Sequence, residues 1–320
     1  MAPMLELLGV EKSFGDQRAV AALDLAVPKG ETCGLIGPSG AGKTTTIRLI
    51  MSILFPDAGQ VQVLGHASAL NAKDRIGYLP EERGVYRKMR VEAFLKYLAG
   101  LKGMSQSQSV PRSRELLAKL GLEDVEKKKC EDLSKGMLQR VQFVGAIVHQ
   151  PELLILDEPF SGLDPVSVRL LKGVIADERR RGTTIVFSTH VMAQAEELCD
   201  RVVMIHQGRK VLDESMTSLR RRYDPTRVLF EPLQSGANID ALRNVPGVVA
   251  VHSKDGEVEL RLTAGTDPAA VIREAAARVV PARIEIARIR LEDVFVGIVR
   301  STADSISELA LRQHLQGLVT

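Results

Sequence analysis

The sequence predicts an α/β unit built on a parallel sheet, followed by a smaller α+β unit. Three observations support this fold class. Over the first two thirds of the chain, short apolar runs that a parallel sheet would bury on both faces alternate with helical patterns. A glycine-rich turn joins one of these runs to a helix. Beyond Arg220–Arg222, strands and helices follow in the order βαββαβ, and 320 residues are enough for two domains.

The first unit opens with strands and then enters the glycine-rich turn. The apolar runs Leu5–Val10 and Ala19–Val27, separated by Gly15–Asp16, predict a small antiparallel sheet. Thr32–Ile36 has the composition of a buried strand, and the pattern Thr44–Leu54 after the turn is helical. The turn therefore lies between a strand and a helix.

The middle of the chain, from about residue 83 to 149, is predicted to be a helical subdomain, and buried strands return after it. Its helices, marked by apolar positions three and four residues apart, are Val91–Leu101, Arg112–Leu120 and Met137–Val148. The later elements are the strands Leu153–Leu156, Thr184–Phe187 and Val202–Ile205, with helices at Ser167–Arg181 and Val191–Cys199.

The second unit has a ferredoxin-like order of elements. We expect a strand at Arg227–Phe230, a helix at Ile239–Asn244, strands at Val248–His252 and Val258–Leu262 joined by an Asp255-Gly256 hairpin, a helix at Pro268–Val279, a strand at Arg283–Ile289 and a closing helix at Leu291–Val299. The domains are therefore placed at residues 1–222 and 223–300, with a tail at 301–320.

Composition excludes several classes of protein. Lys and Arg number 43 and Asp and Glu number 40, a net charge of +3, which disfavours a disordered chain and a strongly basic nucleic-acid-binding protein. Aromatic residues make up 4% with no Trp, so a surface for stacking bases is not expected. Ten basic and ten acidic residues balance between Arg227 and Arg300. We expect no nucleic-acid partner.

Cysteine spacing and hydropathy indicate a cytoplasmic protein. Cys33, Cys130 and Cys199 lie too far apart for a metal motif and are too few for a disulfide scaffold. The apolar run Leu49–Phe55 stops at Pro56, whereas a membrane-spanning helix needs about 20 apolar residues. No N-terminal signal pattern is expected. A role in transport would therefore require a separate membrane subunit.

The glycine-rich turn fits the pattern of a phosphate-binding loop. Its residues are Gly37, Pro38, Ser39, Gly40, Ala41, Gly42, Lys43 and Thr44. Glycines let backbone N–H groups curl around phosphate oxygens, Lys43 can reach the β and γ phosphates, and the Thr44 hydroxyl can bind Mg²⁺. A plain glycine-rich turn is the alternative, which the flanking strand and helix disfavour.

Two carboxylates follow the apolar strand Leu153–Leu156. Asp157 at the end of a buried strand suits Mg²⁺ coordination, and Glu158 is placed to deprotonate an attacking water. Taken alone, such a pair is more often a solvated strand end or a helix cap. The phosphate-binding loop earlier in the chain favours the catalytic interpretation.

These motifs, together with three others, resemble those of the ATP-binding cassette (ABC) ATPases. Leu133–Met137 lies where that family has its signature, Ser161–Asp164 resembles its D-loop, and His190 resembles its switch histidine. The ordered motifs cover residues 5 to 215. Tyr78–Tyr86 and the small C-terminal domain are similar to those of the ATPase subunits of ABC-2 type exporters, including sodium and drug exporters.

The resemblance implies a phosphate-binding-loop cassette with a RecA-like core, an antiparallel β subdomain and a helical subdomain, which uses ATP and Mg²⁺. Two copies would dimerise head to tail, with each ATP between the phosphate loop of one and the signature of the other. The implied nucleotide-binding residues are Phe14, Gly37, Pro38, Ser39, Gly40, Ala41, Gly42, Lys43, Thr44, Thr45, Ser134, Gly136 and Asp164. The implied catalytic residues are Glu158, His190 and Glu81, and the implied metal ligands are Thr44, Asp157 and Glu81.

Some of these assignments have alternatives or depart from the family pattern. Phe14 would stack on adenine, but a core phenylalanine is an equally weighted alternative. Lys135 and Met137 replace the second Gly and the Gln of the usual signature. Glu81 replaces a Gln; it could bind the metal through water, but it cannot donate a hydrogen bond while ionised.

The sequence thus predicts the ATP-hydrolysing subunit of an ABC-2 type exporter. It would act as a homodimer with a separate multi-span permease, peripheral on the cytoplasmic face of the membrane, and Glu82–Val91 would dock the permease. A soluble ABC ATPase acting on ribosomes or DNA is the alternative. Such proteins carry two cassettes or a long insertion, whereas only 90 residues separate Thr44 from Ser134 here. The C-terminal unit could also sense a ligand.

Overall fold

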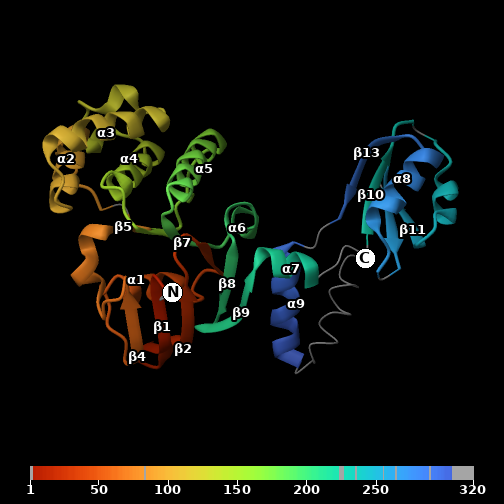
Figure 1. The fold of residues 1–320 in the computed structure, drawn as a ribbon, viewed down its shortest axis with the longest axis horizontal. Helices are drawn as coiled ribbons and strands as arrows, with labels where there is room; N and C mark the ends of the chain where they lie inside the picture. The colour runs from red at the N-terminus through yellow and green to blue at the C-terminus, as the bar shows by residue number, and fades with distance from the viewer. Residues whose placement is uncertain are drawn as a thin grey trace. The chain divides into compact units, whose positions relative to one another are not determined.

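The computed structural model describes residues 3–82, 84–222, 227–234, 236–254, 256–263, 265–287 and 290–304. The chain forms two compact units, Met1–Ser215 and Met216–Thr320 (Figure 1). Arg83, Asp255 of the expected hairpin and the tail from residue 305 onward lie outside the described residues. Within the described part of the chain, no helix has the length and apolar character needed to span a bilayer.

A six-stranded sheet forms the core of the first unit, in the order β5-β6-β7-β3-β8-β9. Its strands are β3 (Thr32–Ile36), β5 (Ile76–Leu79), β6 (Leu153–Asp157), β7 (Thr184–Thr189), β8 (Arg201–His206) and β9 (Arg209–Ser215). Only β9 pairs antiparallel. Every residue of β3, β6 and β7 is buried, as expected of a parallel sheet covered on both faces. The predicted fold class is confirmed.

The helices that follow strands of this sheet are α1 (Lys43–Ile50), α5 (Pro165–Arg180) and α6 (Met192–Leu198). The first helix is shorter than predicted, because Ser52 has a left-handed backbone (φ 54°) that an α-helix cannot contain. Helix α5 starts earlier than predicted, since Asp164 accepts hydrogen bonds from the N–H groups of Val166 and Ser167 and so caps its start.

A small antiparallel sheet has the order β2-β1-β4. Its strands are β1 (Leu5–Phe14), β2 (Gln17–Val27) and β4 (Ala58–Val63). The first two were expected from the sequence as shorter strands, whereas β4, β5 and β9 were not expected. In β4, one residue of six is buried, so the apolar signal is too weak to reveal a strand.

The helical subdomain contains α2 (Val91–Leu101), α3 (Gln106–Lys119) and α4 (Lys135–Ile147), which lie together in Figure 1. Helix α3 starts before the predicted Arg112, because Ser105 and Gln108 form a capping box and the helix continues through Pro111. Arg112 forms an ion pair with the buried Glu178 of α5 at 3.3 Å, which ties the subdomain to the parallel-sheet core.

The second unit has a four-stranded antiparallel sheet in the order β11-β12-β10-β13, the ferredoxin-like arrangement. Its elements are α7 (Met216–Arg222), β10 (Arg227–Pro232), a 3₁₀ helix (Ile239–Asn244), β11 (Val248–Lys254), β12 (Glu257–Leu262), α8 (Pro268–Arg278), β13 (Pro281–Ile286) and α9 (Leu291–Asp304). Phe230, Leu242, Leu260 and Val271 belong to its core. The predicted βαββαβ order is confirmed.

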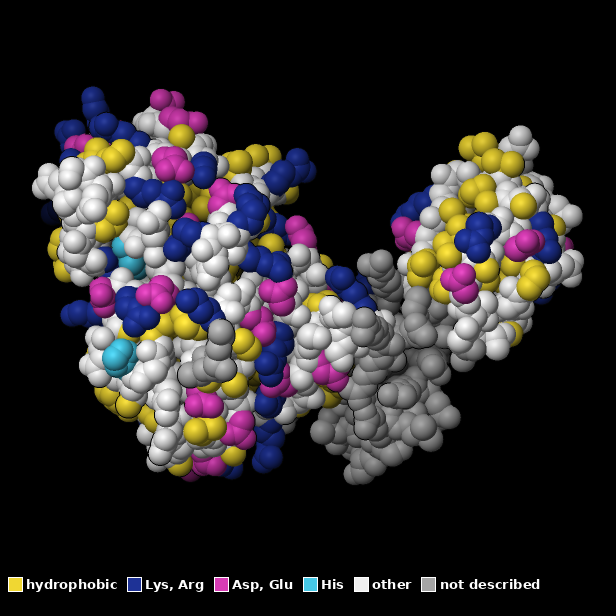
Figure 2. Space-filling model, viewed as in Figure 1, with side chains coloured by type: hydrophobic (Ala, Val, Ile, Leu, Met, Phe, Trp, Pro, Cys, Tyr) yellow, Lys and Arg dark blue, Asp and Glu magenta, His cyan; other side chains and the backbone are white. Residues whose placement is uncertain are grey.

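Charged side chains of both signs are interspersed over the visible face of the first unit (Figure 2), in keeping with the near balance of charge in the sequence. In this view that surface has no extended patch of charged side chains of a single sign.

Gly77 in β5 is packed closely against its neighbours, so a larger side chain there should destabilise the fold. A Cβ on Gly77 would lie 2.2 Å from the Ala146 carbonyl oxygen and 2.9 Å from a Leu154 methyl, whereas one on Gly100 in α2 would meet nothing within 4 Å. We expect Gly77→Ala to lower the free energy of unfolding by about 1–3 kcal/mol through overpacking. The control Gly100→Ala should raise it by about 0.5–1 kcal/mol through helix propensity. Urea unfolding measures both, and equal effects would contradict the packing argument.

Candidate functional site

The glycine-rich loop lies between β3 and α1 and packs tightly against neighbouring backbone. A Cβ on Gly37 would lie 2.2 Å from the Ile205 carbonyl oxygen, and one on Gly42 would lie 2.4 Å from the Ala19 carbonyl oxygen. Gly42 also has a left-handed backbone (φ 109°) where α1 begins. The loop can therefore take this shape only with glycine at these positions.

Lys43, the first residue of α1, has a buried side chain that turns back into the loop. Its Nζ donates hydrogen bonds to the carbonyl oxygens of Gly37 (2.9 Å) and Pro38 (3.1 Å). The same nitrogen lies 3.6 Å from Glu158 Oε1. The ammonium group is thus held at the loop, beside the residue that the sequence assigns as the general base.

Asp157 ends β6 and is 1% exposed. Its Oδ1 accepts hydrogen bonds from Ser188 Oγ (2.6 Å) and Thr44 Oγ1 (3.2 Å), while its buried Oδ2 has no hydrogen-bond partner among the described residues. Burial raises the pKa of this carboxyl, and the charges of Glu81 and Glu158 add to that effect. A buried, unsatisfied carboxylate oxygen of this kind is suited to binding a cation.

Glu158 contacts His190 and Lys43, the two other residues expected near the reacting phosphate. Its Oε2 lies 3.0 Å from His190 Nδ1, which follows β7, and its Oε1 faces Lys43. The Glu158 N–H donates to Ser188 Oγ (3.0 Å), and its backbone is left-handed (φ 48°), an uncommon conformation for a residue with a side chain. Three motifs far apart in the sequence therefore meet in one site.

Glu81, on the segment after β5, completes the set of expected metal ligands. Its Oε2 lies 3.4 Å from Thr44 Oγ1, so the Thr44 hydroxyl lies between Glu81 and Asp157. Hydroxyl and carboxylate oxygens are the ligands that Mg²⁺ prefers, with further positions filled by phosphates and water. The described residues contain no group of three His, Cys, Asp or Glu side chains that could hold a metal by themselves. These oxygens fit Mg²⁺ bound together with a nucleotide.

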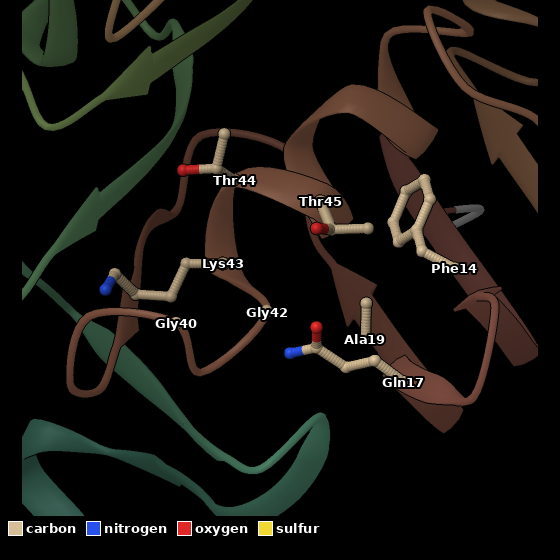
Figure 3. A pocket seen from close by; sticks show the side chains of 8 residues that line it. All are labelled: Phe14, Gln17, Ala19, Gly40, Gly42, Lys43, Thr44 and Thr45. Atoms are coloured by element: carbon tan, nitrogen blue, oxygen red, sulfur yellow. The ribbon is translucent and has the colours of Figure 1, made fainter.

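A pocket of about 240 Å³ opens beside the loop (Figure 3). It is lined by Phe14, Gln17, Ala19, Gly40, Gly42, Lys43, Thr44 and Thr45. The Phe14 side chain is 50% exposed, so the alternative of a core phenylalanine is wrong. A half-exposed aromatic ring beside a phosphate-binding loop can stack on a purine base.

The signature and D-loop residues lie elsewhere in the chain. Ser134 caps α4 by accepting a hydrogen bond from the Met137 N–H (3.2 Å), Lys135 is exposed, and Asp164 caps α5. A hydrogen bond from the Ser167 hydroxyl lowers the pKa of Asp164. Neither Ser134, Gly136 nor Asp164 lines the pocket.

Gln17, Ala19 and Ser188 were not among the site residues expected from the sequence. The turn at Gly15–Asp16 between β1 and β2 brings Gln17 and Ala19 next to Phe14, and this turn was the available local signal for both. Ser188 is placed by the parallel register of β6 and β7, in which it pairs with Asp157. Ser188 is one of three hydroxyl residues in a strand that is buried throughout. A buried hydroxyl needs a hydrogen-bond partner, and this was the available signal.

Comparison with known proteins identifies the family of this chain. Residues 20–161 match the ABC transporter family, and residues 215–299 match the C-terminal domain of proteins like the ATP-binding protein DrrA1-3. An uncharacterized ABC transporter ATP-binding protein, YhaQ of Bacillus subtilis, is 40% identical over 259 residues, which cover 81% of this chain and 86% of that protein. The chain belongs to the ATP-binding subunits of ABC transporters.

Further similarities concern export and structure. The Nod factor export ATP-binding protein I of Burkholderia lata is 36% identical, covering 65% of this ABC subunit and 70% of that protein. A solved structure of the ATP-binding subunit of an ABC transporter has a TM-score of 0.64 and 31% identity, and covers 69% of this chain and 93% of that one. This ABC subunit is thus an ATP-hydrolysing protein and a homologue of exporter ATPases. Subunits of the family dimerise and work with membrane permeases.

Substitution of Ser188 tests whether its hydroxyl stabilises Asp157 and Glu158 through the two hydrogen bonds. Removing its hydroxyl in Ser188→Ala leaves the buried Asp157 carboxylate and the Glu158 N–H each without one hydrogen-bond partner. We expect the free energy of unfolding to fall by about 1.5–3 kcal/mol, together with the rate of ATP hydrolysis. Urea unfolding and phosphate release measure the two effects.

The matched control is Ser253→Ala, which removes the hydroxyl of an exposed serine that also lies within a strand, β11. Its free energy of unfolding should stay within about 0.5 kcal/mol of the parent. An equally small effect of Ser188→Ala would contradict the role assigned to its hydroxyl.

Proposed function

We propose that this ABC subunit hydrolyses MgATP between two copies of itself and thereby drives an export permease encoded separately. The observation that supports the chemistry best is the contact of Glu158 with both His190 and Lys43 at the mouth of the phosphate loop. A carboxylate so placed can accept a proton while the lysine and loop hold the phosphates.

In this proposal Lys43 leaves its loop carbonyls to pair with the β and γ phosphates of ATP, and Phe14 stacks on adenine. Thr44 and Asp157 hold Mg²⁺, with Glu81 as a further ligand directly or through water. Bound Mg²⁺ neutralises charge on the β and γ phosphate oxygens. The orphan Oδ2 of Asp157 supports this placement, since it provides a buried anionic oxygen with no other described partner.

Glu158 acts as the general base. It takes a proton from a water whose oxygen attacks the γ phosphorus, the bond to the β,γ-bridging oxygen breaks, and ADP and phosphate leave. His190 positions the Glu158 carboxylate through the 3.0 Å contact and reaches toward the γ phosphate. With Lys43 drawn to the phosphates, the base is released from its ion pair.

The head-to-tail dimer is proposed to account for the signature residues, which do not line the pocket beside the phosphate loop. Ser134 and Gly136 lie at the start of α4, where first-turn N–H groups have no partner within the helix. Across a head-to-tail dimer these groups would meet the γ phosphate bound to the other copy. Asp164 would approach the same interface, and each site would be complete only with two copies.

The permease would dock on the loop Glu82–Val91 beside the helical subdomain. Tyr86 in this loop is 56% exposed and packs edge-on against Tyr97 of α2, with ring centroids 5.5 Å apart. Exposed aromatic rings of this kind are common anchors of protein interfaces. The subunit would then lie on the cytoplasmic face of the membrane, held there by the permease, with no nucleic-acid partner.

The assignment of the general base has a direct test in Glu158→Gln, which keeps the shape but removes the proton acceptor. Turnover should fall at least about 100-fold, while ATP binding persists and ATP-dependent dimers accumulate. Phosphate release and light scattering measure the two effects. Glu152→Gln is the matched control. Glu152 lies directly before β6, whereas Glu158 lies directly after it, and Glu152 forms its ion pair with Arg75, away from the phosphate loop residues. Normal turnover in Glu158→Gln would exclude Glu158 as the base.

Docking is tested by affinity purification of the full chain from detergent-solubilised native membranes. A protein with several apolar segments of about 20 residues each should co-purify. Tyr86→Asp should reduce its yield, because a charge cannot replace a buried ring at an interface. Val249→Asp, which changes an exposed apolar residue of the second unit, should leave the yield unchanged. Recovery of ribosomes or DNA in place of a membrane protein would overturn the proposal.

A further inference from the structure

The phosphate end of the site contains more negative than positive charge. Glu81 and Asp157 flank the Thr44 hydroxyl at 3.4 and 3.2 Å, and Glu158 lies 3.6 Å from the Lys43 ammonium group. Three carboxylates therefore surround the position that phosphate must occupy, with the Lys43 ammonium among them. A phosphate entering alone would be repelled by two uncompensated carboxylates.

A divalent cation reverses that balance, but the described residues do not hold one unaided. No group of three His, Cys, Asp or Glu side chains among them is arranged to bind a metal. The buried Oδ2 of Asp157 nevertheless has no described partner and is available as a ligand. The cation is therefore expected to arrive with the nucleotide, its remaining ligands being phosphate oxygens and water.

Glu81 differs from the other two carboxylates in being exposed and in having the Thr44 hydroxyl as its single described polar contact. Asp157 is fixed by Ser188 and Thr44, and Glu158 pairs with Lys43. No described residue forms an ion pair with Glu81, whose polar contact is the Thr44 hydroxyl. The charge of Glu81 is thus free to act on whatever lies beside Thr44.

We propose that Glu81 makes this subunit select the magnesium complex of ATP over the metal-free nucleotide. This inference rests on the proposed function, which places the metal at Thr44 and Asp157. With the metal present, the Glu81 carboxylate is attracted to it; without the metal, the same carboxylate repels the phosphates. A neutral side chain at this position would lose both effects, so the ratio of the two affinities reports on Glu81.

The size of the effect follows from Coulomb's law. A unit charge about 4 Å from another changes an affinity about fivefold even at the permittivity of bulk water, and more in a partly buried site. Removing the Glu81 charge should therefore tighten binding of the metal-free nucleotide by at least about fivefold. Binding of the magnesium complex should weaken, because the attraction between the Glu81 carboxylate and the metal is lost.

The test is calorimetric titration of the full chain with a non-hydrolysable ATP analogue, once with magnesium and once with EDTA. The parent, Glu81→Gln and Glu82→Gln are compared at one ionic strength. Glu82 is the matched control, because it is the next residue but its carboxylate pairs with Arg48 at 3.0 Å. Glu81→Gln should bind the analogue at least about fivefold more tightly in EDTA, while Glu82→Gln binds as the parent does in both conditions.

Three results would overturn the inference or its basis. An unchanged affinity of Glu81→Gln in EDTA would overturn it. Equal tightening in Glu82→Gln would overturn it as well, since the effect would then be one of overall charge. A parent that binds equally well with and without magnesium would contradict the metal site of the proposed function itself, so the two failures are distinguishable. Both substituted side chains are exposed, and thermal unfolding verifies that each variant folds.

Discussion

The parallel pairing of β3, β6 and β7 is the constraint on which the rest of the structure depends. Because parallel strands end at the same edge of a sheet, the phosphate loop after β3, the carboxylates at the end of β6 and His190 after β7 all reach one place. The pairing of Asp157 with Ser188 fixes the hydrogen bonds that hold both carboxylates. A shift in this register would separate the base from the phosphate loop.

The charges at this edge of the sheet determine which ligand it can bind. Lys43 is buried and its charge is divided between loop carbonyls and Glu158, so an entering phosphate replaces existing interactions instead of meeting a free ammonium group. The surrounding carboxylates make the same place unfavourable for phosphate unless a cation comes with it. In the proposed function this edge is therefore organised for a metal-bound nucleotide, and the exchange of partners by Lys43 would couple nucleotide binding to release of Glu158 from its ion pair.

Much of the fold was accessible from the sequence because its signals are local. Strands β3, β6, β7 and β8 are apolar runs bounded by turns, and the order of the second unit follows from such runs alone. Strand β4 was missed because it is mostly exposed. The start of α3 was placed too late, because apolar spacing set the expected start and the capping box of Ser105 and Gln108 was not used. Pairing with β1 stabilises β4, whose own pattern is weak, whereas the start of α3 has a local cause in its capping box.

By itself, the sequence determined the chemistry: a phosphate loop, a pair of carboxylates and a histidine, each recognisable from a few neighbouring residues. Tertiary structure alone decided how they interact, because distances between segments depend on strand register and not on local pattern. It placed the Thr44 hydroxyl between Glu81 and Asp157, exposed the Phe14 ring at the pocket, and made Ser188 the support of both carboxylates. Each of these contacts joins residues that lie far apart along the chain or that no pattern singles out.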